Sequence, residues 1–264
     1  MMASDLTPLR DDLVAESEAL FTILDDITPA QWFLPTPSPG WTIADQVSHL
    51  AYFDDATLLS LVDPDRFRRE AAELTSAGAD FADRVAADHR GLTGEQLLDW
   101  FGPSRKALVT GYADVDPTAR LPWYGPDMGV ASSITARLME TWAHAQDIAD
   151  TLGVRREATG RLRHVAYIGI RALPYTFRVN GLAVPDDPIR VELAGPDGET
   201  WSWGPAGAPD RVTGTALDFC LVVTQRRHRD DTGLTATGDT AEAWIAIAQA
   251  FAGPAGPGRE RGPR

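Results

Sequence analysis

Glu140 and His144 are the two residues whose types and spacing point most directly to metal chemistry. Side chains four positions apart on a helix project from the same face, so both would reach one point in space. A carboxylate and an imidazole on an otherwise apolar helix are costly to bury unpaired, and a bound metal ion removes that cost. The same spacing also fits a hydrogen-bonded Glu–His pair without a metal. A metal site needs a third ligand from another helix, and His49, which lies among apolar residues, is the best candidate.

Two histidines and one carboxylate form the ligand set of a catalytic metal site. Such a site leaves one position open for water or substrate, whereas a structural site is usually closed by a fourth protein ligand. The sequence offers no obvious fourth ligand. Cys220 is the only cysteine, which excludes a cysteine-based zinc site and a disulfide within the chain. His49 taken alone also fits a buried histidine with an ordinary structural role.

The composition argues against several classes of partner. The net charge of −14 disfavours nucleic acid, because phosphates are neutralised by clustered Lys and Arg. No apolar run approaches the roughly 20 residues that span a bilayer. The first residues lack the basic and apolar regions of a signal peptide. We therefore expect a cytoplasmic protein, monomeric or homodimeric, that acts on small molecules and binds neither nucleic acid nor membrane.

The helices that position the candidate ligands follow one another through the first half of the chain. Apolar periodicity predicts helices over residues 5–27, 42–62, 66–90, 93–108 and 132–152. Thr42 and Asp45 predict a capped start for the helix that carries His49. Gly153 predicts the end of the helix that carries Glu140 and His144. Long helices with short links predict an antiparallel bundle.

The second half of the chain has a different, mixed character. Its patterns predict strands over residues 189–193 and 200–203 with a hairpin turn between them, and helices over 161–173, 214–226 and 240–251. We therefore predict a domain boundary near residue 155, with domains over 1–155 and 156–252. Residues 253–264, rich in Pro, Gly and Arg, predict a disordered tail.

Two segments around the candidate ligands carry a family resemblance. They are residues 40–50 (GWTIADQVSHL), which contain His49, and residues 136–147 (ARLMETWAHAQD), which contain Glu140 and His144. Both resemble metal-ligand motifs of the DinB-like helix bundles. More narrowly, they are similar to the motifs of the mycothiol-dependent maleylpyruvate isomerase family, in its actinobacterial branch.

A third segment extends the resemblance into the second half. Residues 214–226 look like the helix that closes the family's C-terminal domain. That helix often ends in Gly-Arg, and here Gln225 replaces the glycine while Arg226 matches the arginine. The resemblance covers roughly residues 5–251.

The resemblance implies a fold and a chemistry. The fold is α plus α/β: a DinB-like four-helix bundle that binds one divalent metal, usually zinc, through His49, Glu140 and His144, and a smaller C-terminal α/β domain. The metal would activate mycothiol, a low-molecular-weight thiol, as its thiolate, because a coordinated thiol loses its proton. The thiolate would be transferred to a small electrophile or assist its isomerisation.

Two other interpretations of the same site remain open. One is a metal-dependent hydrolase in which metal-bound water replaces the thiol as nucleophile. The other is a metal-binding stress or regulatory protein that catalyses nothing.

Two arginines are candidates for contact with the substrate. Arg226 is the candidate catalytic residue, which would contact a substrate carboxylate or stabilise developing negative charge, unless it is only a solvated helix end. Arg137, one turn before Glu140, would bind substrate or thiol or support the ligands from behind. A surface salt bridge explains Arg137 equally well.

Three further residues are placed near the site by the sequence. Trp123 and Tyr124 lie in a Pro/Gly-bounded loop and would line the pocket mouth, with core packing as the competing interpretation. Asp45 lies four residues before His49 and would hold the His49 ring in position, unless it only caps the helix.

Overall fold

A computed structural model of the chain describes residues 5–262 and divides it into two compact units, Met1–Arg155 and Arg156–Arg264. Residues 1–4, at the start of the predicted first domain, lie outside the described residues. The same holds for residues 263–264, at the end of the predicted tail. The first unit is helical and the second combines helices with a sheet, so the predicted α plus α/β fold class is confirmed. Within residues 5–262 no helix is long and apolar enough to cross a membrane.

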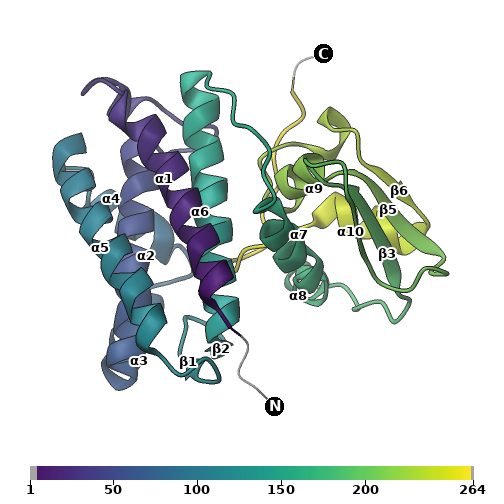
Figure 1. Cartoon of the computed structure of the whole chain (residues 1–264), viewed down its shortest axis with the longest axis horizontal. Helices are drawn as coiled ribbons and strands as arrows, with labels where there is room; N and C mark the ends of the chain where they lie inside the picture. The colour runs from purple at the N-terminus through teal and green to yellow at the C-terminus, as the bar shows by residue number, and fades with distance from the viewer. Residues whose placement is uncertain (1–4, 263–264) are drawn as a thin grey trace. The chain divides into compact units, whose positions relative to one another are not determined.

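Four long helices build the first unit. Figure 1 shows them side by side: α1 (Thr7–Asp25), α2 (Ile43–Val62), α5 (Gly94–Asp114) and α6 (Val130–Leu152). The helix α2 packs against both α5 and α6, and α1 packs against α6. The unit is completed by α3 (Pro64–Ser76), α4 (Phe81–Asp88), a short 3-10 helix (Gln31–Phe33) and a two-stranded hairpin of β1 (Arg120–Leu121) and β2 (Met128–Gly129).

The two helices that carry the candidate ligands have well-defined ends. The Asp45 carboxylate accepts a hydrogen bond from the Thr42 backbone N–H (2.8 Å), and the Asp45 N–H donates to the Thr42 hydroxyl, so the predicted capping box is present. Gly153 ends α6 with φ of 67°, a left-handed conformation that glycine adopts without strain. These ends fix the axial positions of His49 on α2 and of Glu140 and His144 on α6.

The segment over residues 66–90 differs from the single helix predicted for it. It forms α3 (Pro64–Ser76) and α4 (Phe81–Asp88), separated by a turn at Gly78. Gly78 has φ of 132°, which a helix cannot contain and which a side chain would resist. The Ala-rich, charged composition favoured a helix throughout and concealed this break.

The second unit contains a four-stranded sheet in the order β4-β3-β5-β6. Its strands are β3 (Ile189–Ala194), β4 (Thr200–Trp203), β5 (Asp210–Thr215) and β6 (Thr235–Thr237). The central pair β3 and β5 is parallel, and both outer pairs are antiparallel. The helices are α7 (Leu162–Arg171), α8 (Leu173–Val179), α9 (Ala216–Val223) and α10 (Asp239–Ile247), with a 3-10 turn at Arg229–Asp231.

The start of the predicted helix 214–226 is a strand in the structure. Residues 210–215 form β5, and α9 begins only at Ala216, where the Thr215 hydroxyl accepts a hydrogen bond from the Asp218 N–H (3.0 Å). The strand was hard to recognise because its stability comes from pairing with β3, which is distant in sequence.

The segment predicted as a disordered tail has no regular secondary structure from residue 253 to residue 262, yet it is hydrogen-bonded within the second unit. The Gly253 N–H donates to the Tyr175 hydroxyl (2.8 Å), and the Gly262 N–H donates to Asp231 (2.7 Å). Arg259 Nε donates to the Gln225 carbonyl (3.3 Å).

Candidate metal centre

His49, Glu140 and His144 meet between α2 and α6. One nitrogen or oxygen atom from each lies within 4.8 Å of the others. His144 Nε2 lies 3.1 Å from Glu140 Oε2, and His49 Nε2 lies 3.7 Å from the same oxygen. Zinc bonds of about 2.1 Å in a tetrahedron separate neighbouring ligand atoms by about 3.4 Å, a value that the two distances bracket. The spacing of these atoms therefore fits a divalent metal ion.

The local electrostatics favour deprotonated ligands. Burial, with a smaller contribution from nearby His144, lowers the pKa of His49 to about 3, so its imidazole is neutral at pH 7. Burial alone would raise the pKa of Glu140, but the polar contacts of its carboxylate with the His144 and His49 rings outweigh burial and hold that pKa well below its ordinary value. A neutral imidazole and a carboxylate are the protonation states that bind metal.

A hydrogen-bond relay fixes the tautomer of His144. The Thr36 hydroxyl donates to the Trp41 carbonyl (2.9 Å), so its oxygen accepts from Gln46 Nε2 (2.9 Å). The Gln46 amide oxygen therefore faces His144 Nδ1, which must carry the hydrogen. In neutral His144 the lone pair then lies on Nε2, directed at the Glu140 carboxylate. Two facing lone-pair atoms repel unless a proton or a cation lies between them.

The Gln46 contact was not anticipated from the sequence. Metal-ligating histidines usually donate their second ring N–H to a neighbouring oxygen, and the fully buried Gln46 supplies that oxygen. Gln46 lies one turn before His49, inside the first motif. Nothing in that spacing says that its amide reaches His144 on another helix.

Asp45 does not hold the His49 ring, and this prediction is wrong. Its carboxylate accepts hydrogen bonds from Thr42 and from Arg90 Nε (2.9 Å). His49 Nδ1 is buried with no hydrogen-bond partner among the described residues. The reason is geometric: a side chain in the first turn of a helix leans towards the N-terminus, and here it completes the capping box.

Arg137 is buried, with 3% of its surface exposed. Its Nε donates to Asp54 (3.2 Å), while Arg105 donates to both oxygens of the same carboxylate, at 2.6 and 3.1 Å. The surface salt-bridge interpretation is therefore wrong. The interpretation that Arg137 binds substrate or thiol directly is also not supported by this structure, because the guanidinium lies in the bundle interior. Both guanidiniums contact the Asp54 carboxylate, which holds them in the bundle interior.

Aromatic side chains surround the candidate ligands. The Trp41 ring lies 5.3 Å from the His49 ring and 5.9 Å from the His144 ring, measured between centroids. The Phe53 ring lies 4.5 Å from the His49 ring. The Glu140 side chain remains 22% exposed, so the ligands are shielded but accessible. Trp41 and Phe53 were not identified as site residues from the sequence.

Trp123 and Tyr124 belong to an aromatic cluster that continues outward from Phe53. Trp123 stacks on Phe67 (5.8 Å) and Tyr124 stacks on Phe81 (5.0 Å). Tyr124 also lies 5.6 Å from Phe53. Both loop residues are half-buried. Trp123 and Tyr124 are thus packed in this cluster, where Phe53 lies between them and His49, and they do not contact the candidate ligands.

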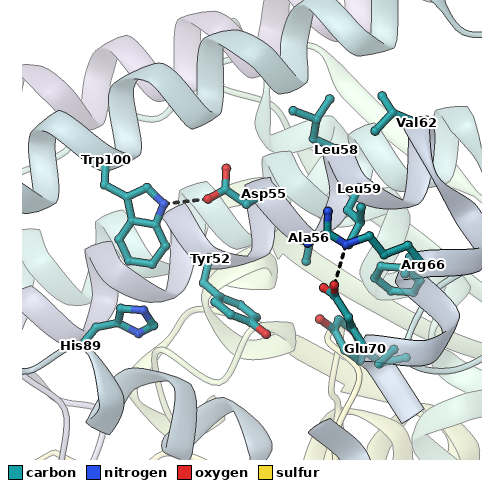
Figure 2. A pocket seen from close by; sticks show the side chains of 13 residues that line it. Tyr52, Asp55, Ala56, Leu58, Leu59, Val62, Arg66, Glu70, His89 and Trp100 are labelled. Carbon is teal, nitrogen blue, oxygen red and sulfur yellow. Dashed lines mark hydrogen bonds and ion pairs between the residues drawn. The ribbon is translucent and has the colours of Figure 1, made fainter. Parts of the chain in front are cut away.

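Tyr124 also borders a cavity of about 540 Å³ along α2, drawn in Figure 2. Its walls include Tyr52, Leu59 and Trp100, and Trp100 Nε1 donates to Asp55 (2.7 Å). None of the three candidate ligands, and not Trp123, lines this cavity. The cavity is therefore a neighbour of the metal centre and not the centre itself.

Arg226 lies in the second unit, directly after α9. It is 9% exposed, and its Nη1 donates to the Thr224 carbonyl (2.7 Å). It is thus not a solvated helix end. Its contact with a substrate stays a prediction.

Comparisons with known proteins agree with this architecture. The profile of the mycothiol maleylpyruvate isomerase N-terminal domain matches residues 13–149, a stretch that contains all three candidate ligands. The profile called wyosine base formation matches residues 185–237 in the second unit. Two uncharacterized proteins from strains of Mycobacterium tuberculosis are 44% identical over 256 residues, covering 97% of this chain and 100% of each relative.

Solved structures give the same picture at the level of the fold. Two crystal structures of the mycothiol-dependent maleylpyruvate isomerase, one of a histidine-to-alanine mutant, cover 90% of this chain and 94% of theirs. The TM-score is 0.61 and the sequence identity is 15%. At this identity the likeness concerns the fold, because one fold hosts many activities.

Proposed function

The chain belongs to the family defined by the mycothiol maleylpyruvate isomerase N-terminal domain, and on that premise we propose that it is a metal-dependent, thiol-activating enzyme. The thiol is mycothiol, and the metal is a divalent ion, most simply zinc. The reaction is transfer of the thiol to a small electrophile, or thiol-assisted isomerisation of that electrophile.

One observation carries the proposal: two histidine nitrogens converge on one carboxylate oxygen at 3.1 and 3.7 Å in a shielded but accessible site. The first distance fits either a hydrogen bond or two ligands of one metal. The second exceeds hydrogen-bond length and is close to the separation of two ligands of one metal. Three protein ligands leave one position of a tetrahedron for an exogenous group.

The residues of the chain have distinct roles in this proposal. His49, Glu140 and His144 would hold the metal, and Gln46 keeps His144 in the tautomer that presents Nε2. Trp41 and Phe53 limit water around the ligands, which strengthens electrostatic interactions there. A bound divalent ion supplies a thiolate nucleophile at neutral pH by lowering the pKa of the thiol.

Arg226 is proposed to hold the electrophile. Substrates that accept a thiolate develop negative charge as the new bond forms, and a guanidinium stabilises such charge through paired N–H groups. This role predicts that Arg226→Lys lowers turnover while thiol binding stays intact.

The test of thiol activation uses cobalt in place of zinc. The Co²⁺-loaded protein is titrated with mycothiol, and near-ultraviolet absorption reports thiolate bound to cobalt. We expect a band that saturates with thiol and that is absent from metal-free protein and from Glu140→Gln. A cobalt-loaded protein with no such band would overturn the thiol proposal. Ester hydrolysis without thiol would then favour the hydrolase, and no turnover would favour the non-catalytic protein.

The electrophile is tested separately. Maleylpyruvate, named in the related crystal structures, is the first candidate, assayed with and without mycothiol. Thiol-dependent isomerisation would identify the reaction. Thiol binding without turnover of maleylpyruvate would mean that the electrophile is a different compound, and the thiol proposal would stand.

A further inference from the structure

A buried ion network follows the metal centre along the two helices that carry its ligands. It consists of Asp54 on α2, Arg105 on α5 and Arg137 on α6. We propose that these three are positioning residues, which fix the turn of α6 that carries Glu140 relative to His49 on α2. Their side chains would not touch the metal. The inference rests on the proposed metal centre and names the groups that set the distance between two of its ligands.

Asp54 is the centre of this network. Its side chain is fully buried, and its carboxylate accepts hydrogen bonds from two guanidiniums. Arg105 donates to both carboxylate oxygens, at 2.6 and 3.1 Å, and Arg137 Nε donates to one of them at 3.2 Å. A guanidinium that donates to both oxygens fixes the angle of the carboxylate as well as its distance. Asp54 therefore joins α2 to α5 and α6 in a defined geometry.

The contacts of the network on α6 lie on both sides of Glu140 in the sequence. Arg137 precedes Glu140 by three residues, and Thr141 follows it directly. Arg105 Nη1 donates to the Thr141 hydroxyl (3.0 Å), which in turn donates to the Arg137 carbonyl (2.7 Å). The same Arg105 nitrogen donates to Ser17 on α1. The turn of α6 that presents Glu140 is thus linked by one hydrogen-bonded network to α1, α2 and α5.

The contact between Asp54 and Arg137 also continues the seam between α2 and α6 that holds the candidate ligands. Asp54 follows His49 by five residues on α2, and Gln46 makes a polar contact with α6 at the other end of the seam. The ligands therefore lie between two polar contacts. A slide of α6 by one residue would move Glu140 by about 1.5 Å, whereas metal–ligand distances tolerate only about 0.2 Å. The network opposes such a slide.

The energetics of the network favour a positioning role over a purely stabilising one. Burial of an ion pair costs desolvation free energy that can exceed the attraction between the charges, so apolar residues of similar volume often stabilise a fold equally well. Arg137 Nη2 is buried and has no hydrogen-bond partner among the described residues, which is a further cost. The directional geometry of the network is the property that apolar packing could not supply.

A triple apolar variant separates positioning from stability. Asp54→Leu, Arg105→Met and Arg137→Leu together replace the network with apolar side chains. We expect a folded protein whose urea midpoint is close to that of the wild type or above it. In crystals of the metal-free protein, the distance between His49 Nε2 and Glu140 Oε2, 3.7 Å in the wild type, should change by more than about 0.5 Å. An unchanged distance would overturn the proposal.

Cobalt binding gives a second measurement, in solution, because the visible absorption of Co²⁺ depends on its coordination geometry. The triple variant should bind Co²⁺ about tenfold more weakly or worse than the wild type, with an altered spectrum. A variant that keeps both the spectrum and the affinity of the wild type would overturn the positioning role and leave the metal centre in place. A wild type that binds no cobalt would overturn the metal centre, and the distance in metal-free crystals would still decide whether the network positions Glu140.

Two single substitutions answer the question if the triple variant does not fold. Arg137→Lys keeps the positive charge and loses the forked donor, so it should alter the cobalt spectrum. Tyr112→Phe is the matched control, because it removes a buried hydrogen bond between α5 and Ser133 of α6 (2.7 Å), seven residues before Glu140. It should lower the urea midpoint and leave the cobalt spectrum unchanged. An unaltered spectrum in Arg137→Lys, or equal changes in both variants, would overturn the proposal.

Discussion

The two units each hold a histidine whose ring is oriented by a neighbouring group, with different results. At the metal centre of the first unit, His49 and His144 direct Nε2 towards the Glu140 carboxylate, an arrangement that fits a cation. In the second unit, His228 lies beside Arg227 and Arg229 and lines a pocket of about 220 Å³ whose lining contains no Asp or Glu. Basic neighbours disfavour a bound cation, so the surroundings of a histidine distinguish a candidate metal ligand from one that is not.

The comparison also shows how backbone and amide groups set the role of a histidine. Gln46 accepts from His144 Nδ1 and leaves Nε2 with a lone pair, whereas the Asp230 N–H donates to His228 Nδ1 and leaves Nε2 with a hydrogen. The same side chain thus presents a lone pair at Nε2 in one unit and an N–H at Nε2 in the other.

The largest expected effect comes from removing one histidine from each unit. His144→Ala should weaken zinc binding by more than about 100-fold, since loss of a ligand costs more than loss of its supporting partner. His228→Ala should leave zinc binding unchanged, because His228 is not in the group of described residues that could hold a metal ion. Chelator competition measures both affinities. Equal zinc affinities in the two variants would contradict the assignment of His144 as a ligand.

A smaller effect is expected from the residue that sets the His144 tautomer. Gln46→Leu should weaken zinc binding by about 10–100-fold, because the ring loses the acceptor that orients it. Asp45→Asn is the matched control on the same helix. It should retain zinc affinity and lose about 1 kcal/mol of stability through the weakened cap. The reverse pattern would restore Asp45 as the partner of the metal centre.

The structure shows why local spacing succeeded for Glu140 and His144 and failed for Asp45. An i,i+4 relation on one helix fixes two side chains on one face, so the pair in α6 followed from the sequence. The capping box of α2 is equally local and was also predictable. Whether Asp45 caps the helix or contacts His49 could not be decided from local spacing. Arg90, which is distant in sequence, also binds the Asp45 carboxylate.

Contacts between distant segments account for the other failures. The burial of Arg137 depends on Asp54 and Arg105 from two other helices, so no local pattern around Arg137 favoured burial over a surface salt bridge. The strand β5 depends on pairing with β3. The fold class was predictable because it follows from periodicity within each half of the chain, and the third ligand required the family resemblance.

The low pKa of His49 predicts acid sensitivity of the metal-free protein. The folded pKa of about 3 lies below the usual value of 6.5. Between these values the unfolded chain binds a proton at His49 that the folded chain excludes. The free energy of unfolding should therefore fall as pH falls from 6.5 to 5, with His49 contributing up to about 1.4 kcal/mol per pH unit.

Urea unfolding of metal-free protein measures this slope. His49→Gln should show a shallower decline over the same pH range, because glutamine does not titrate. If wild type and variant decline equally, the His49 imidazole is not held neutral by burial, and this part of the account of the metal centre is wrong.

The smallest expected effect concerns the backbone that follows α9 in the second unit. Gln225→Ala keeps a side chain at φ of 59°, whereas Gln225→Gly relieves the strain, and both lose the bond to Ala248. The glycine variant should be more stable than the alanine variant by about 1 kcal/mol in urea unfolding. An alanine variant as stable as the glycine variant would mean that the left-handed conformation carries no strain here.

The most direct test of the central claim is a calorimetric titration of the metal-free wild-type protein with Zn²⁺, accompanied by elemental analysis of the product. The predicted result is one equivalent of zinc, bound tightly by the wild type and not retained by Glu140→Gln. Absence of zinc binding, or one equivalent retained equally by the Glu140→Gln protein, would contradict a metal centre built from His49, Glu140 and His144.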